Sequence, residues 1–425
     1  MTALPATLAA GARLFRSRLA GNVLSLYAVQ GLNTLMPLIT LPFLLRALHP
    51  AGYGSIMFAQ SLMGYALLVI EFGFNFTAAR EISVARDKPD VVARVYWTTL
   101  AAKSLLLLAC VSVIAVIVAV VPDFRRDWPV FAASALLLLG NVAFPQWYFQ
   151  GLERLKETAA IQAVAKVVGA ACVIAFVRSP EDLIIGAVIL SAPQLLAALA
   201  ALALRRPLAP KQFYWPTWLD IRHALGQSGH LFAASVSTTL YLHTNPFVLG
   251  LMRGPEAVAL YSLANRLIAA MQALVSPVAQ AAFPRASLLF SQQRDEAWRL
   301  VKRIAWVAVP TMAFACIVLA IFAPQIVAIL GGSKWGEVVP VLRTMAVVPV
   351  LVTIATLLAQ TVMVNIGLTR QLFWIYLSVG LLNLALLPLL ITARGAQGAA
   401  LSLVTAELLG PILMLVVVWR RTHAR

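Results

Sequence analysis

Long apolar runs recur along the whole chain and constrain its fold more than any other feature. Each is about 20 residues long, which is the length that an α-helix needs to cross the hydrocarbon core of a bilayer. Of the 425 residues, 61% are hydrophobic and only 12% are charged, whereas a soluble domain has about 25% charged residues. The runs lack the alternation of barrel strands, so the sequence predicts an all-α polytopic membrane protein.

We predict about twelve transmembrane helices from these runs. They span residues 21–45, 54–78, 96–121, 129–150, 158–177, 183–204, 229–252, 257–282, 304–330, 338–363, 371–391 and 397–419. The first run is too long for the apolar core of a signal peptide, so we expect it to be retained as a span. The three cysteines all lie inside apolar runs, which predicts neither a disulfide framework nor a metal site.

The distribution of positive charge predicts the topology. The net charge of +17 raises the alternative of nucleic-acid binding, but the Lys and Arg residues lie in short gaps between apolar runs and form no basic domain. If the N-terminus is cytoplasmic, roughly three times as many of them fall in the inner segments as in the outer loops. The pattern therefore predicts that both termini are cytoplasmic.

Matching motifs suggest that the chain contains two related halves. His49-Pro50 and Gly254-Pro255 both join the first and second spans of a half, and they are 205 residues apart. At the same shift, Gln60 meets Asn265. Parallel repeats of this kind are common in transporters and place the binding site between the halves. We therefore predict an N-terminal six-helix lobe at 1–204, a linker at 205–228 and a C-terminal six-helix lobe at 229–425.

The predicted linker is basic and amphipathic. It carries Trp215 and Trp218 beside Lys211 and Arg222, a pattern that suits a helix lying in the membrane interface. A second stretch with this pattern is residues 297–306. The alternative for the linker is a plain basic cytoplasmic loop, and the pattern alone does not decide between the two.

A resemblance to a known family is carried by residues 21–83. This segment contains Leu45-Arg46-Ala47-Leu48-His49-Pro50-Ala51-Gly52-Tyr53-Gly54 and Glu71-Phe72-Gly73-Phe74-Asn75-Phe76-Thr77-Ala78-Ala79-Arg80-Glu81. It resembles the polysaccharide transporter family of O-antigen (Wzx-type) flippases, whose members read LGPEGYG and DFGFN..A.RE at these places. The stretch Trp147-Tyr148-Phe149-Gln150-Gly151 is similar to a third motif of that family. This chain departs from the pattern at His49-Pro50-Ala51 and at Glu71.

The resemblance implies a fold, a substrate and a location. The family belongs to the multidrug/oligosaccharidyl-lipid/polysaccharide exporter superfamily, whose members have two six-helix lobes around a central cavity. The implied substrate is an undecaprenyl-diphosphate-linked oligosaccharide, an O-antigen or exopolysaccharide repeat unit. Its implied route is from the cytoplasmic to the periplasmic leaflet of the bacterial inner membrane. Other implied partners are membrane lipids and the polymerase and chain-length proteins of the same glycan pathway.

Charged residues deep inside spans are candidates for the binding site, because burying a charge in the bilayer is costly. Arg266, Lys166 and Glu407 lie about nine or ten residues inside their spans. Arg266 and Lys166 would contact the diphosphate, since Arg offers a bidentate fork and Lys a point charge. The structural alternative is an ion pair with Glu71 or Glu407. Lys103 and Arg343 lie nearer to a span end, so we expect them to snorkel to water.

Polar uncharged residues and carboxylates complete the candidate site. Amides and an imidazole would hydrogen-bond sugar hydroxyls, or would instead only link helices to one another. Glu71 and Glu407 are candidates for proton or ion coupling, to a proton or sodium gradient, and no cofactor is predicted. The polar candidates are Gln30, Asn33, Gln60, Asn265, His243 and Asn245.

No enzyme constellation is present in the sequence. The chain has no GxGxxG, GxxxxGK[ST], HExxH or GxSxG motif, so we predict a protein that is not an enzyme and is not driven by ATP. The alternatives are a multidrug antiporter or a peptidoglycan-precursor flippase of the same superfamily. A membrane-embedded glycan polymerase is a weaker alternative, because the outer loops between the predicted spans are short.

Overall fold

The structure is a computed structural model that describes the backbone of residues 6–203, 209–274 and 276–423. Side chains are described from Met36 onward, apart from residues 155–156, 204–208, 231, 233–242, 275–278, 280–281 and 422–425. Within these ranges helices are the only regular elements, which confirms the all-α class.

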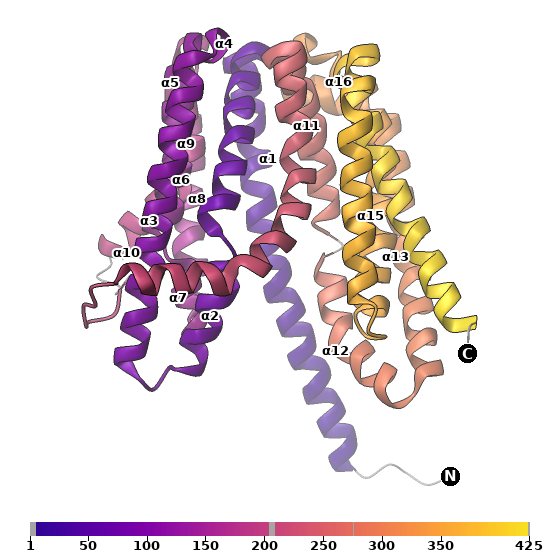
Figure 1. Ribbon diagram of the computed structural model, residues 1–425. Helices are drawn as coiled ribbons and strands as arrows, with labels where there is room; N and C mark the ends of the chain where they lie inside the picture. The colour runs from indigo at the N-terminus through magenta and orange to yellow at the C-terminus, as the bar shows by residue number, and fades with distance from the viewer. Residues whose placement is uncertain (1–5, 204–208, 275, 424–425) are drawn as a thin grey trace.

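The helices follow one another in a simple order (Figure 1). They are α1 (Ala6–Glu71), α2 (Phe74–Val84), α3 (Pro89–Val120), α4 (Pro122–Arg126), α5 (Trp128–Ser134), α6 (Leu136–Ala143), α7 (Gln146–Gly151), α8 (Leu155–Phe176), η1 (Pro180–Asp182), α9 (Leu183–Ser191), α10 (Pro193–Ala203), α11 (Trp218–Gln272), α12 (Ser276–Gln292), α13 (Arg294–Gly331), η2 (Ser333–Trp335), α14 (Val338–Met345), α15 (Val348–Thr356), η3 (Leu357–Met363) and α16 (Thr369–His423).

Three of the long helices contain a sharp turn at a single residue. The turn in α1 is at His49, with φ 54° and ψ 177°, and the turn in α11 is at Gly254, with φ 78° and ψ 179°. A proline follows each of them. The two halves of the predicted repeat therefore turn sharply at matching positions. The third turn is at Gly395 of α16. At His49 this conformation is strained, because it is one that only glycine adopts readily.

The membrane-spanning character of the chain is evident from helix length and composition. Seven stretches in the described chain are long and apolar enough to cross a membrane, and a bent pair at 180–191 and 193–203 adds an eighth. The folded-back helices α1 and α16 each contribute one stretch to this count, so the number of twelve stays a prediction. Both ends of the chain lie at the same end of the molecule (Figure 1), as an even number of crossings requires.

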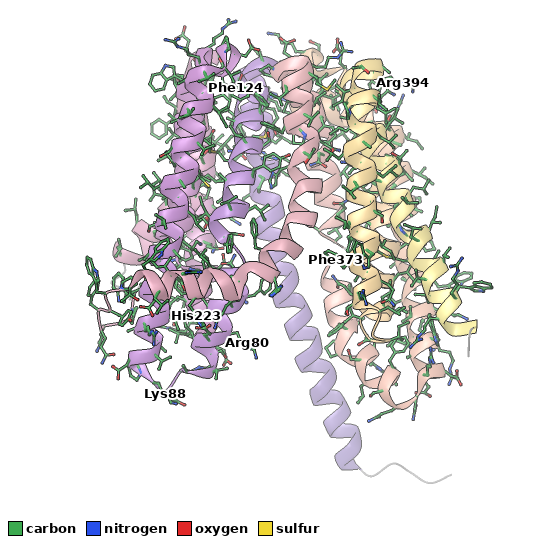
Figure 2. All side chains as sticks on the ribbon, viewed as in Figure 1. Arg80, Lys88, Phe124, His223, Phe373 and Arg394 are labelled. Carbon is green, nitrogen blue, oxygen red and sulfur yellow. The ribbon has the colours of Figure 1, made fainter. Side chains whose placement is uncertain are left out.

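Basic residues lie at the ends of the molecule that the charge pattern predicts. Figure 2 shows Arg80 and Lys88 near the end where the termini lie, and Arg394 at the opposite end. We call the end with the turns at His49, Gly254 and Gly395 the turn end, and the other the termini end. Which of them faces the cytoplasm stays a prediction.

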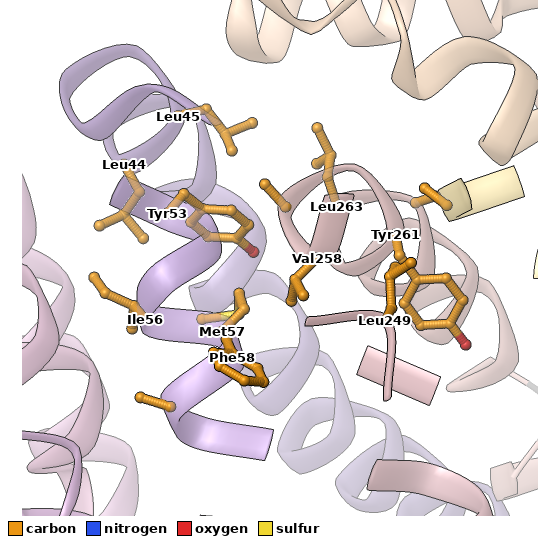
Figure 3. Close-up of a cluster of buried hydrophobic side chains, with 14 of the residues drawn as sticks. Leu44, Leu45, Tyr53, Ile56, Met57, Phe58, Leu249, Val258, Tyr261 and Leu263 are labelled. Carbon is orange, nitrogen blue, oxygen red and sulfur yellow. The ribbon is translucent and has the colours of Figure 1, made fainter. Parts of the chain in front are cut away.

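The two halves of the chain, 6–203 and 218–423, meet where α1 packs against α11. Figure 3 shows the apolar side chains of this junction, among them Tyr53 and Phe58 of α1 and Leu249 and Val258 of α11, all of them buried. In Figure 1 the two groups of helices converge at the turn end and spread apart toward the termini end. The first part of α1 runs between them. The division into lobes at 1–204 and 229–425 stays a prediction.

The start of α11 runs across α2 and α3 of the N-terminal half (Figure 1). Its side chains Trp218 and Leu219 are 65% and 74% exposed, and Trp215 just before it is 79% exposed. Asp220 faces the other way and is buried. The assignment of residues 205–228 as a basic amphipathic linker stays a prediction. The second predicted stretch, 297–306, is the beginning of the continuous helix α13 and no separate element.

Candidate functional site

The two halves touch closely at the turn end. A Cβ at Gly54 would lie 1.9 Å from the carbonyl oxygen of Pro255, so only glycine permits this approach of α1 to α11. Arg46 donates a hydrogen bond to the carbonyl of Ile329 at 2.7 Å, and Lys334 lies 3.3 Å from the ring of His49. Contacts from α11, α13 and η2 thus close this end of the molecule.

Trp335 is the largest side chain in this closure. It is fully buried and packs edge-on against Tyr53, with 5.8 Å between the ring centroids. Its indole N–H donates to the carbonyl of Leu45 at 3.2 Å. The indole comes from η2 in the C-terminal half and both partners come from α1, so Trp335 links the halves directly.

We predict that Trp335→Ala opens the turn end. Truncating a buried Trp costs about 3–5 kcal/mol, enough to shift an equilibrium between closed and open ends about 100-fold or more. Spin labels at the exposed positions Ala51 and Ser333 would report the distance between the halves. We expect a longer distance in Trp335→Ala than in Trp335→Phe, which keeps a ring. An unchanged distance distribution would show that Trp335 does not hold this end closed.

Further from the turn end, α1 and α11 are joined by polar and aromatic contacts. The hydroxyls of Tyr65 and Thr244 lie 2.8 Å apart, and Phe58 stacks on Phe247 at 5.8 Å between the ring centroids. The imidazole of His243 lies against Gly64, where a Cβ would be 2.4 Å from its Nδ1. The structure therefore places His243 at the junction between the halves, half-buried.

Arg266 has a distinctive position at the same junction. Among the described residues, its Nη1 is buried without a hydrogen-bond partner, and so is the hydroxyl of Tyr53. The two side chains are close enough to interact electrostatically. A buried donor without a partner is costly. Contact of Arg266 with an anionic ligand stays a prediction. No ion pair joins Arg266 to Glu71 among the described contacts.

Gln60 and Asn265, the matched positions of the repeat, are both half-buried. Gln60 donates a hydrogen bond to the hydroxyl of Ser191 at 3.3 Å, so it links α1 to α9 inside the N-terminal half. Asn265 precedes Arg266 on α11. Their predicted contact with sugar hydroxyls stays a prediction.

Asn245 belongs to a buried chain of hydrogen bonds. It donates to the hydroxyl of Tyr261 at 3.1 Å and accepts from the amide of Asn383 at 2.8 Å. The side-chain Oδ1 of Asn383 accepts in turn from the hydroxyl of Ser402 at 2.8 Å. Asn245 is only 1% exposed. These contacts link α11 to α16 and correspond to the helix-linking alternative for this residue.

Half-buried Glu71 is part of a polar cluster with the buried residues Asn141 and Lys103, which the sequence did not indicate. It accepts a hydrogen bond from the amide of Asn141 at 3.1 Å, and the carbonyl oxygen of Asn141 accepts from the ammonium of Lys103 at 2.8 Å. We call Glu71, Asn141 and Lys103 the charge relay. Lys103 is 2% exposed, so the prediction that it snorkels to water was wrong.

The remaining candidates lie elsewhere in the molecule. Lys166 is half-buried on α8, and Glu407 is half-buried on α16 within electrostatic reach of Tyr261 and Tyr376. The side chains of Gln30 and Asn33 lie outside the described residues. Arg343 is exposed and donates to the carbonyl of Ala320 at 3.1 Å. No cluster of His, Cys, Asp or Glu suited to a metal ion occurs among the described residues.

A pocket of about 310 Å³, lined by both apolar and charged residues, lies at the termini end between α2, α3 and α11. Asp220 accepts from Arg94 at 2.5 Å, from the Thr217 hydroxyl at 2.7 Å and from Tyr214 at 2.9 Å. The hydroxyl and the backbone N–H of Thr217, together with the Arg94 guanidinium, hold the pKa of Asp220 well below its usual range. This network ties the start of α11 to α3, and His223 lies beside it (Figure 2).

A comparison with family models decides which family this chain belongs to. The model described as "Polysaccharide biosynthesis protein" matches residues 19–293, well over half of the chain. The chain belongs to the polysaccharide biosynthesis protein family. The match covers most of α1 and the α1–α11 junction with Tyr53, His243 and Arg266.

Relatives of this polysaccharide biosynthesis protein are transporters. A protein of Escherichia coli strain K12 named "Putative O-antigen transporter" is 29% identical over 401 residues, covering 93% of this chain and 96% of that protein. One of Shigella dysenteriae with the same name is 26% identical and covers 93% and 98%. These names agree with the prediction of a transport protein and not an enzyme, and the apolar helices of the described chain confirm its multi-pass membrane character.

Solved structures show the fold of this family member. An inward-facing multidrug resistance MATE family transporter has a TM-score of 0.71 at 15% identity, covering 93% of this chain and 95% of that one. The lipid II flippase MurJ, in an inward closed conformation, has a TM-score of 0.68 at 13% identity and covers 93% and 87%. The transporter fold expected from the resemblance is thereby confirmed.

Proposed function

We propose that this protein is a flippase that moves an undecaprenyl-diphosphate-linked oligosaccharide from the cytoplasmic to the periplasmic leaflet. The observation that carries the proposal is the buried, unpartnered guanidinium nitrogen of Arg266 between α1 and α11. A diphosphate leaving water needs donors of this kind, and a guanidinium binds its oxygens with two parallel hydrogen bonds. The O-antigen transporters among the relatives support this class of substrate.

The proposed mechanism is alternating access between two six-helix lobes, 1–204 and 229–425, with twelve spans in all. With both termini cytoplasmic, the turn end closed by Trp335 faces the periplasm. The structure then represents the state that receives substrate from the cytoplasmic leaflet. Separation of Trp335 from Tyr53 and Leu45 would accompany release on the periplasmic side.

In this proposal Arg266 is the principal diphosphate ligand, and Lys166 adds a second positive charge as the substrate moves. Asn265 precedes Arg266 on α11, and His243 lies against Gly64 at the α1–α11 junction; both would contact the first sugar. Gln30, Asn33, Gln60 and Asn245 are further candidate sugar contacts. Gln60 and Asn245 already hydrogen-bond to neighbouring helices, so their part would begin only after a helix movement.

We propose that the charge relay couples transport to an ion gradient, with Glu71 as the group that takes up a proton. Protonation of Glu71 would leave Lys103 as an isolated buried charge, which is unfavourable, so the relay would rearrange. Glu407 is the second candidate, and a sodium gradient the alternative driving force. Glu71→Gln is expected to abolish the acceleration of transport by an imposed pH gradient. Equal acceleration in the native protein and the variant would remove Glu71 from this role.

Direct binding tests the proposed substrate class. We expect undecaprenyl-diphosphate oligosaccharide to raise the unfolding temperature of the detergent-solubilised protein more than undecaprenyl monophosphate does. A cationic dye is expected to have no effect, because an unpaired arginine disfavours a cation. Stabilisation by the dye alone would instead favour a multidrug antiporter, the activity named for the MATE neighbour. If a peptidoglycan precursor raises the unfolding temperature equally, the protein recognises the diphosphate and not the glycan.

A further inference from the structure

An apolar groove of about 420 Å³ lies between α3 and α5, on the side of the N-terminal half away from the α1–α11 junction. Its walls are formed by residues of α3 and by residues at and just after α5. The residues that line it are Val111, Ile114, Ala115, Val118, Ala119, Arg125, Trp128, Phe131, Ala132 and Ala135.

The groove exists because small side chains line two helices that are held apart. α4 joins α3 to α5 at the turn end, but the two helices approach one another at few points along their length. Alanines at 115, 119 and 132 are exposed where larger side chains would have filled the space. In a membrane no water is present to fill such a gap, so a hydrocarbon chain is the natural occupant.

The outer face of α3 shows that the groove opens toward lipid. Val113, Val116 and Val120 are 58%, 62% and 72% exposed, which suits a helix surrounded by acyl chains. The groove is therefore open to an acyl chain that enters sideways from the bilayer.

One end of the groove carries the features that recognise a lipid headgroup. Arg125 of α4 is its only charged lining residue, and Trp128, 59% exposed, lies beside it. Both are at the turn end, where Figure 2 shows their neighbour Phe124. An arginine binds a phosphate through paired hydrogen bonds, and tryptophan is enriched at the level of the headgroups.

We propose that this groove is a binding site for one anionic phospholipid, with an acyl chain between α3 and α5 and its phosphate on Arg125. The site is separate from Arg266 and the α1–α11 junction, and it does not depend on the transported substrate. The lipid packs between α3 and α5 and fills the space that these two helices leave at the surface of the N-terminal half.

Native mass spectrometry of the full-length, delipidated protein tests the site with dioleoylphosphatidylglycerol and dioleoylphosphatidylethanolamine as probes. We expect one phosphatidylglycerol molecule to bind first. Ala119→Phe, which fills the groove, is expected to weaken this binding at least tenfold, whereas Val113→Phe, on the lipid-facing side of the same helix, leaves it unchanged. Arg125→Gln is expected to abolish the preference for phosphatidylglycerol over phosphatidylethanolamine.

The outcomes separate the site from its alternatives. If Ala119→Phe lowers the unfolding temperature, Ala132→Phe replaces it. This variant fills the groove from the opposite wall. Unchanged binding in a folded groove-filling variant would overturn the proposal. An unchanged lipid preference in Arg125→Gln would overturn the headgroup assignment. Stoichiometric displacement of phosphatidylglycerol by undecaprenyl phosphate, blocked by Ala119→Phe, would assign the groove to an isoprenoid tail and overturn the phospholipid.

Discussion

Arg266→Gln is expected to weaken binding of undecaprenyl-diphosphate oligosaccharide by about 10–150-fold. The reason is that a hydrogen bond to a charged group contributes about 1.5–3 kcal/mol, and the Nη1 of Arg266 has no protein partner among the described residues. Glutamine keeps a donor but loses the charge and the second parallel hydrogen bond. Transport should slow by a similar factor at substrate concentrations below saturation. Titration of the purified variant with the substrate measures the effect.

Two control variants identify the origin of this loss. Arg343→Gln removes the same charge from an exposed arginine that contacts only the Ala320 carbonyl in the described structure, and we expect native affinity. Arg266→Lys keeps the charge without the fork and should retain intermediate affinity. If Arg266 served only to link helices, Arg266→Gln would lower the unfolding temperature while leaving the dissociation constant of the substrate unchanged.

Lys103→Met is expected to destabilise the protein by about 3–5 kcal/mol. Lys103 is 2% exposed and reaches Glu71 through the amide of Asn141. Removing the charge of Lys103 leaves the carboxylate of Glu71 without an opposite charge. The cost of taking that carboxylate out of water is then no longer offset. Methionine has nearly the same length as lysine, so the effect of lost packing is small. The midpoint of thermal or denaturant unfolding in detergent measures the change.

A double-mutant cycle shows whether this loss arises from the charge relay. Glu71→Gln combined with Lys103→Met should recover a large part of the stability, because no uncompensated charge remains. Lys88→Met, at the exposed turn before α3, is the matched control and should be neutral. Additive losses from Glu71→Gln and Lys103→Met would mean that the two side chains are not coupled through Asn141.

The turns between paired spans were predictable from the sequence, because a short motif imposes them. His49-Pro50 and Gly254-Pro255 are 205 residues apart, and His49 and Gly254 both have a positive φ with a ψ close to 180°. A proline restricts the residue before it and disfavours the helical conformation there. The helical class and the apolar stretches were predictable for a similar reason, since both depend on local composition.

The charge relay was not predictable, because it depends on which face of a helix is buried. Lys103 was expected near a span end, but α3 begins at Pro89, about two turns before the predicted start at residue 96. Asn141 lies in the apolar run Leu136–Ala143, and only the packing of α3 and α6 brings it between Lys103 and Glu71. The position of Asn245 within its span likewise did not show that its side chain hydrogen-bonds to Tyr261 and Asn383.

Leaflet exchange in liposomes tests the central proposal most directly. The purified native protein would be reconstituted with undecaprenyl-diphosphate oligosaccharide, and an external sugar-modifying reagent would report the fraction of glycan exposed outside. We predict that the native protein lets the reagent modify the whole glycan pool, whereas protein-free liposomes protect the inner-leaflet fraction. The contrary result is that the native protein leaves the inner-leaflet glycan as protected as in protein-free liposomes, with and without a pH or sodium gradient. That result would contradict the proposal that this chain is a flippase for lipid-linked oligosaccharide.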